Sequence, residues 1–129
     1  MNLRDTFLNL VGPHEHLWVV TTLPTDAGEV AIFNFTTRHP GSGRDDTCIV
    51  RPGEHPFLKR ESIVAYGLGK MLPVDAANQN RYYFDFRQPI SPALLARIQQ
   101  GALESEHTPL KLQVVVRASM AAQLRLIPN

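Results

Sequence analysis

Two runs of apolar, β-branched and aromatic residues dominate the first third of the chain. They cover His16–Leu23 and Glu29–Thr37, and the segment Leu23–Gly28 between them carries a proline, an aspartate and a glycine. This order is typical of a β-hairpin. Both runs are more continuously apolar than alternating, so we expect both faces of each strand to be covered, as in a small barrel.

The chain before this hairpin has a different spacing. Apolar residues recur at Leu3, Phe7, Leu8 and Val11, and a Gly-Pro pair follows them. The spacing is roughly that of one helix face, and glycine followed by proline ends a helix. It predicts a short helix or turn that docks on the rest of the domain.

Short extended elements separated by loops are predicted for the middle of the chain. Arg38–Asp46 is rich in glycine, proline and charge, which is typical of an exposed loop. The further predicted elements are a strand over Thr47–Arg51, a turn over Pro52–Pro56, an extended segment over Ser62–Leu72 interrupted by Gly67 and Gly69, a loop over Asp75–Arg81 and a strand over Arg81–Phe86.

The C-terminal third is helical in pattern. Ser91 followed by proline is a helix start, because the serine hydroxyl can cap free backbone N–H groups and proline suits the first helical position. One apolar stripe follows, made of Leu94, Leu95, Ile98, Ala102 and Leu103. Thr108 followed by proline repeats the signal and favours a second helix over 109–127. The β-branched run Val114–Val116 leaves a strand as the alternative there.

These elements predict a mainly β fold with C-terminal α structure (α+β). We expect one domain over residues 1–129, with a barrel over about 14–88 and a helical tail over about 91–127. No internal repeat or low-complexity tract suggests a second domain.

Composition narrows the class of protein. The 129 residues are 43% hydrophobic, which allows a real core, and the net charge of +1 argues against a strongly basic nucleic-acid-binding surface. The single Cys48 excludes an internal disulfide and fits a reducing compartment. Met1–Leu10 lacks the apolar stretch of a signal peptide, and no run is long enough to span a membrane. We therefore expect a cytoplasmic protein without a membrane partner.

Polar residues with useful chemistry lie at the outer ends of the predicted hairpin. His16 is at one end, and Thr36, Thr37 and Arg38 are at the other. Folding of the hairpin brings these ends together. A facing turn adds the remaining candidates, His55, Lys59 and Arg60.

Several of these segments resemble the PemK/MazF family of toxin endoribonucleases, which are small SH3-like β-barrels. Val30–Thr37 is similar to the family's second strand, with Thr36 at the position of the family's threonine. Leu58–Val64 is similar to its Lys-Asp-Ser strand, and Ser91–Leu103 lies where its helix belongs. The likeness covers about two-thirds of the chain. It implies an SH3-like barrel with one or two terminal helices.

The chain departs from the family pattern at positions that matter for catalysis. His16 and Leu17 stand where the family has Arg-Pro, and Ala65 and Gly67 stand where some members have Arg and Asp. Only Thr36 is carried over from the family's catalytic set. A similar His-Leu-Trp start also occurs in a group of uncharacterised bacterial proteins, so the chain resembles a divergent branch.

The resemblance implies an endoribonuclease that needs no metal and no cofactor. A base removes the proton of the ribose 2′-OH, an acid protonates the leaving oxygen, and cations stabilise the phosphorane. Histidine suits both proton transfers because it titrates near neutrality. The predicted catalytic residues are His16, Thr36 and His55, and the predicted RNA and phosphate ligands are Thr37, Arg38, Lys59 and Arg60. The implied partners are an antitoxin protein, single-stranded RNA and a second copy of the chain.

Other interpretations of the same residues remain open. Loss of the Arg-Pro pair favours a non-catalytic barrel that binds protein or RNA. His14 and His16 share a strand face, which suggests a metal-dependent hydrolase, although two histidines are an incomplete site. Arg38, Arg44 and Arg51 bracket a loop and suggest a track for phosphate, but Asp45 and Asp46 offset their charge, which favours a solvated loop. Cys48 has apolar neighbours and reads as buried packing.

Overall fold

The computed structural model describes residues 1–11, 14–76 and 84–126. Its strands are β1 (Thr6–Val11), β2 (His14–Val20), β3 (Glu29–Thr37), β4 (Ile49–Val50), β5 (Ser62–Val64), β6 (Lys70–Pro73) and β7 (Asp85–Arg87). A short 3₁₀ helix, η1 (Tyr66–Leu68), separates β5 from β6, and α2 (Pro92–Glu104) and α3 (Leu110–Arg125) follow the strands. The predicted class, mainly β with C-terminal helices, is confirmed.

The described strands form one antiparallel sheet with β3 at its centre. The order is β4-β5-β3-β2-β1-β7, and β6 also pairs with β3. Ile32 of β3 pairs with both Val20 of β2 and Lys70 of β6, so these two strands occupy opposite edges of β3. The far end of β3 pairs with β5. The long strand β3 therefore connects the two parts of the sheet.

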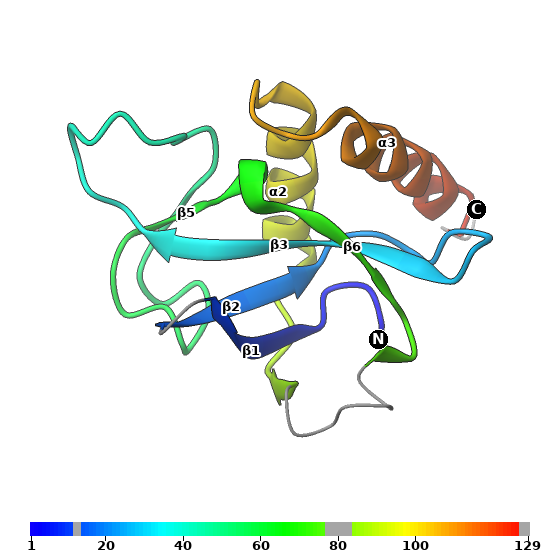
Figure 1. The fold of residues 1–129 in the computed structure, drawn as a ribbon, viewed down its shortest axis with the longest axis horizontal. Helices are drawn as coiled ribbons and strands as arrows, with labels where there is room; N and C mark the ends of the chain where they lie inside the picture. The colour runs from blue at the N-terminus through cyan, green and yellow to red at the C-terminus, as the bar shows by residue number, and fades with distance from the viewer. Residues whose placement is uncertain (12–13, 77–83, 127–129) are drawn as a thin grey trace.

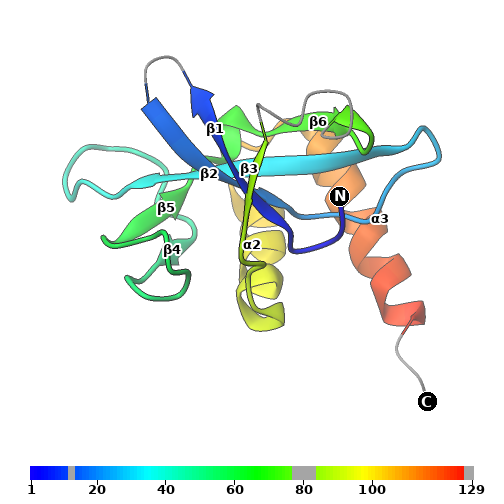
Figure 2. The same cartoon turned by 90° about the horizontal axis from the view of Figure 1, so that it is seen from below.

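Both faces of the sheet are covered. Figures 1 and 2 show α2 and α3 on the same side of the strands, where Leu17, Val19 and Phe33 belong to the larger core. The alternate residues Trp18 and Val20 pack in a second cluster with Phe7, Val30 and Ile32. Burial on two faces explains why the hairpin runs are continuously apolar, as predicted.

The N-terminal segment contradicts the prediction of a helix or turn. Residues Thr6–Val11 form strand β1, which pairs with β2 along its whole length and with β7. Phe7 is buried in one cluster and Leu8 in the other. A strand that is covered on both faces needs adjacent apolar residues, and this spacing mimics a helical one. The sheet therefore begins earlier than the predicted boundary at about residue 14.

The other predicted elements agree with the structure in type and differ at their ends. The first hairpin strand ends at Val20 rather than at about Leu23, and the strand predicted over Thr47–Arg51 is reduced to β4. The extended segment over Ser62–Leu72 is interrupted by η1 near Gly67 and Gly69, as predicted. Much of the strand predicted over Arg81–Phe86 lies outside the described residues, and the described strand there is β7.

Both C-terminal elements are helices, which settles the alternative over 109–127. Ser91 caps α2, since its hydroxyl accepts a hydrogen bond of 3.1 Å from the Leu94 N–H. Thr108 does not cap α3 in this way; the Pro109 carbonyl accepts bonds from the N–H groups of Leu112 and Gln113 instead. Leu112 and Val116 are buried against the sheet and α2. Tertiary packing thus outweighs the low helix propensity of the valine run.

A buried polar network fixes the position of α3. The Gln99 side-chain amide donates to the Thr21 carbonyl and to Gln123 Oε1, at 2.9 and 2.7 Å. Ser119 Oγ donates to the same Gln123 oxygen and accepts from the Leu23 N–H. Because each of these groups has a partner, the network orients α2 and α3 relative to the hairpin turn.

Candidate functional site

A cleft of about 700 Å³ opens where the start of β2 meets the end of β3. Two loops complete its walls, residues 38–47 between β3 and β4 and residues 51–61 between β4 and β5. Its polar lining includes His14, His16, Thr36, Thr37, Lys59 and Arg60. His39 and Arg44 from the first loop and Phe57 from the second also line it. Five of the seven predicted site residues therefore share one cavity.

Strand register explains why His16 and Thr36 meet. Trp18 of β2 lies opposite Asn34 of β3, and two further steps of the same antiparallel register bring His16 level with Thr36. Successive side chains alternate between the faces of a strand, so all four residues belong to one face. On the other edge of β3, Thr37 pairs with Ser62 of β5. The predicted convergence of residues twenty apart in the chain is thus present.

The His16 ring is positioned by two partners of opposite character. Its Nδ1 lies 3.1 Å from the Phe35 carbonyl oxygen, which only accepts, and 3.3 Å from Nδ2 of Asn34, which only donates. Either tautomer of the ring therefore has a partner. In both, Nε2 stays available, since no group among the described residues forms a hydrogen bond to it. A half-buried imidazole held in this way can accept or donate a proton.

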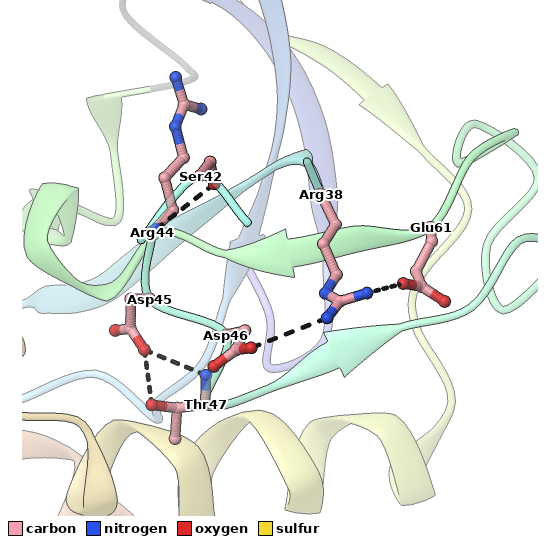
Figure 3. Close-up of polar contacts among 7 residues, drawn as sticks. All are labelled: Arg38, Ser42, Arg44, Asp45, Asp46, Thr47 and Glu61. Carbon is pink, nitrogen blue, oxygen red and sulfur yellow. Dashed lines mark hydrogen bonds and ion pairs between the residues drawn. The ribbon is translucent and has the colours of Figure 1, made fainter. Parts of the chain in front are cut away.

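The two arginines of the first loop have different roles. Arg38 bonds to Glu61 at 2.7 Å and lies 3.8 Å from Asp46, and it does not line the main cleft. Figure 3 shows the Arg44 side chain extending away from these carboxylates. Arg44 has no ion pair within the described part of the chain, and it lines the cleft. Of the two arginines in this loop, Arg44 is thus available to a ligand in the cleft, whereas Arg38 holds the loop.

Asp45 anchors the same loop to the helical layer. Its carboxylate accepts hydrogen bonds from the N–H and hydroxyl of Thr47 and from the hydroxyl of Ser105 at the end of α2. Partial burial alone raises the pKa of Asp45, but the bonds from Ser105 and Thr47 outweigh it and the net pKa is lowered. The aspartates that seem in sequence to cancel Arg44 are therefore occupied elsewhere.

His55 lies apart from the cleft and is structural in character. Its side chain is 2% exposed; Nδ1 accepts from the Phe57 N–H at 3.0 Å, and Nε2 lies 2.6 Å from the Gln88 carbonyl. Thr6 Oγ1 donates to the same carbonyl. Desolvation lowers the pKa of His55, Arg87 lowers it further, and the Gln88 carbonyl opposes them. The ring is a neutral link between the β4–β5 loop and the segment after β7, so it is not in place for the predicted catalysis.

Two further interpretations from the sequence can be compared with the structure. Among residues 1–11, 14–76 and 84–126, no three His, Cys, Asp or Glu side chains gather as a metal site would require. His14 and His16 therefore lack the further ligands that a hydrolytic metal needs.

Cys48 is buried, and desolvation raises the pKa of its thiol, as expected of a packing residue. No helix in the described chain is long and apolar enough to cross a membrane.

The fold of this chain is similar to that of a solved endoribonuclease structure. No family model matches the chain, and no curated protein matches its sequence. One solved structure, a mycobacterial endoribonuclease in complex with its cognate antitoxin, is similar to this chain with a TM-score of 0.52 and 18% sequence identity. The superposition covers 84% of this chain and 98% of the matched chain. The chain has the fold of that endoribonuclease. The predicted resemblance to the PemK/MazF toxins is thereby confirmed at the level of the fold.

Sequence reasoning undervalued two cleft residues, Arg44 and His39, and one residue that holds the His16 ring, Asn34. Arg44 was set against its acidic neighbours, although those acids bond to Ser105, Thr47 and Arg38 in space. His39 lies in a loop whose path no periodicity predicts. Asn34 lies inside an apolar strand. Burial of a polar side chain costs free energy unless it is hydrogen-bonded, so its position in this run was the sequence feature that could have indicated a functional role.

Proposed function

We propose that this protein is an endoribonuclease that cleaves single-stranded RNA in the cleft without a metal ion. The observation that carries the proposal is the convergence of His16, Thr36 and Arg44 in one cavity. Lys59 and Arg60 face it from the opposite loop. The shared fold with an endoribonuclease supports the same conclusion.

The chemistry follows from an imidazole beside hydroxyls and cations. His16 Nε2 takes the proton of a ribose 2′-OH, and the 2′ oxygen forms a bond to the adjacent phosphorus. The bond from phosphorus to the 5′ oxygen then breaks, and that oxygen takes a proton from an acid. The products carry a 2′,3′-cyclic phosphate and a 5′-hydroxyl. The two candidate acids are His14, two residues along the same strand face, and His39 in the facing loop.

The charged phosphorane needs positive charge and hydrogen-bond donors around it. Arg44 has no competing carboxylate among the described residues and offers a planar, bidentate guanidinium. Lys59 and Arg60 add charge, and the hydroxyls of Thr36 and Thr37 donate hydrogen bonds. Arg38, which the sequence predicted as a phosphate ligand, instead holds the loop that carries Arg44 and does not contact the phosphate itself.

A cleavage assay tests the proposal. Fluorescently labelled single-stranded RNA is incubated with purified protein in EDTA, and we expect cleavage by the wild type. His16→Ala should lower the rate by about 10²–10⁴-fold, the usual contribution of a positioned base. Arg117→Ala, an exposed cation on α3 outside the cleft, is the matched control and should cleave normally. If the wild type binds the RNA without cleaving it, the protein is a non-catalytic RNA-binding barrel instead.

We further infer a cytoplasmic protein that is neutralised by an antitoxin. The similar endoribonuclease was solved with its cognate antitoxin, and a protein that covers the cleft would block RNA. Co-expression with the product of the adjacent gene should yield a stable complex that no longer cleaves RNA. Separate elution of the two proteins would contradict this partner.

The proposed homodimer has a suitable surface on α3. Leu110, Val114 and Leu124 are 74, 58 and 71% exposed, and at helical spacing they lie on the face opposite to the buried Leu112 and Val116. Exposed apolar stripes of this kind are typical of interaction sites. Light scattering should give twice the monomer mass, and Val114→Asp should return the monomer. A wild-type monomer would contradict the dimer.

A further inference from the structure

A second cavity, of about 430 Å³, adjoins the cleft. His16, Thr36 and Arg44 line both cavities. A strand of RNA whose phosphate contacts these residues therefore has room for one of its bases next door. The volume lies within the range of about 300–1,000 Å³ that is usual for small-molecule sites.

The walls of this second cavity suit a flat, partly apolar group. Ile63, Ala65 and Leu68 line it from β5 and η1, and His107 faces them from the loop between α2 and α3. Leu68 is 57% exposed although it is a large apolar side chain. An imidazole ring is one of the surfaces on which unstacked bases stack in RNA-binding proteins, and the aliphatic side chains add apolar contact.

One buried polar atom at this cavity lacks a partner. Asn34 is fully buried, and within the described residues its Oδ1 accepts no hydrogen bond. Its Nδ2 lies toward His16, at 3.3 Å from the ring nitrogen. An unsatisfied buried acceptor is costly to a free protein, so it is rare unless another group satisfies it.

We propose that the second cavity is a base subsite, and that Asn34 Oδ1 selects a base with an amino group on its outer edge. This inference rests on the proposed RNA cleavage. Adenine and cytosine present N6 and N4 donors at that edge, whereas guanine and uracil present the acceptors O6 and O4 in the same place. An acceptor that meets the base at this position therefore favours adenine and cytosine, because the donors of guanine (N1–H and N2–H₂) and of uracil (N3–H) lie farther along the edge. Oδ1 has almost no surface open to water, so a side chain of the cavity wall must turn aside before the base reaches it.

The test measures base preference rather than activity alone. Oligouridine substrates carry a single A, C, G or U on either side of one cleavable linkage, and the other linkages are protected by 2′-O-methyl groups. For wild-type protein we expect kcat/KM to be roughly tenfold higher for A and C than for G and U at one of the two positions, because a mismatched base leaves the buried oxygen unpaired.

Variants connect that preference to the cavity. Asn34→Leu should reduce the ratio to about one, and Asn34→Asp, which keeps an acceptor, should retain it. Gly67→Val adds bulk beside His107, where a Cβ would make ordinary contacts at 3.6 Å, and it should weaken the preference without altering a buried residue. It serves as the second probe if Asn34→Leu does not fold.

The outcomes separate the two proposals. Cleavage that shows no preference for A and C at either position, or a preference that both Asn34→Leu and Gly67→Val preserve, overturns the subsite while the endoribonuclease stands. A wild type that cleaves none of these substrates overturns both.

Discussion

Two histidines, His16 and His55, were expected at one active site, and the structure gives them opposite surroundings. His16 is half-buried at the edge of an open cleft, with Nε2 uncommitted. His55 is 2% exposed, and both of its ring nitrogens have backbone partners. The difference shows that residue type alone does not make an acid or base. A histidine acts on substrate only where the fold leaves one nitrogen free and accessible.

The same contrast appears between the two arginines of loop 38–47. Arg38 is bonded to carboxylates on both sides, and Arg44 is left free because Asp45 and Asp46 are occupied by other groups. In each pair, one residue stabilises the fold (His55 and Arg38), and the other is available to a ligand (His16 and Arg44).

The largest expected effect is the loss of activity in His16→Ala without loss of the fold. Cleavage of RNA should fall by about 10²–10⁴-fold. The free energy of unfolding should fall by no more than about 1–2 kcal/mol, because the ring is only half-buried and water in the open cleft can replace it as the partner of the Phe35 carbonyl and the Asn34 amide. Urea unfolding followed by circular dichroism gives the second value. A large loss of stability would mean that His16, like His55, is structural.

His55→Ala should have the reverse effect. It leaves the Phe57 N–H without its acceptor, removes one of the two donors to the Gln88 carbonyl, and empties the space of a ring that is 2% exposed. We expect a loss of about 2–4 kcal/mol, measured as a lower urea midpoint at unchanged slope. The folded fraction should still cleave RNA at close to the wild-type rate. Full stability combined with loss of cleavage would restore His55 to the catalytic set.

The arginine pair gives an intermediate effect. Arg44→Ala should lower kcat/KM by about 10–100-fold, since it removes a charge-assisted bond to the phosphate. Arg38→Ala should cost at most about 1 kcal/mol of stability, as usual for exposed ion pairs, with a smaller loss of cleavage. Equal kinetic losses in the two arginine variants would contradict the different roles of Arg38 and Arg44.

Lys59→Ala should reduce the slope of the logarithm of RNA affinity against the logarithm of salt concentration by about 0.7, because one phosphate contact is lost.

Acid sensitivity gives the smallest effect. The pKa of His55 is lowered in the folded protein, so the unfolded chain binds more protons as pH falls below about 6.5. Stability should be complete above that pH and should decline below it until the folded ring also titrates. Comparison of urea midpoints at pH 7.5 and 5.5 should show this loss in the wild type. His55→Gln should show less of it, and an identical loss would remove His55 as the cause.

Much of the fold was predictable because it depends on local signals. The hairpin around Leu23–Gly28 combines β-branched runs with a turn, and Ser91 before proline starts α2 as expected. The N-terminal strand was not predictable in the same way. Its neighbours β2 and β7 are distant in sequence, and burial on two faces removes the alternation that identifies a strand.

The site was predictable where strand register determines it. His16 and Thr36 meet because they lie on paired strands of one hairpin, so their separation in sequence implied their proximity. Loop residues could not be placed in this way. The position of Arg44 depends on a bond between Asp45 and Ser105, sixty residues apart, and that of His55 on a contact with Gln88. Such contacts arise only from the complete tertiary structure.

The chemistry of the RNA ends tests the central claim most directly. A defined oligoribonucleotide is incubated in EDTA with wild-type protein or His16→Ala, and the products are analysed by mass spectrometry. We predict fragments with 2′,3′-cyclic phosphate and 5′-hydroxyl ends from the wild type, and almost none from His16→Ala. Intact RNA with the wild type, or the same fragments at the same rate from both proteins, would contradict the assignment of His16 as the catalytic base.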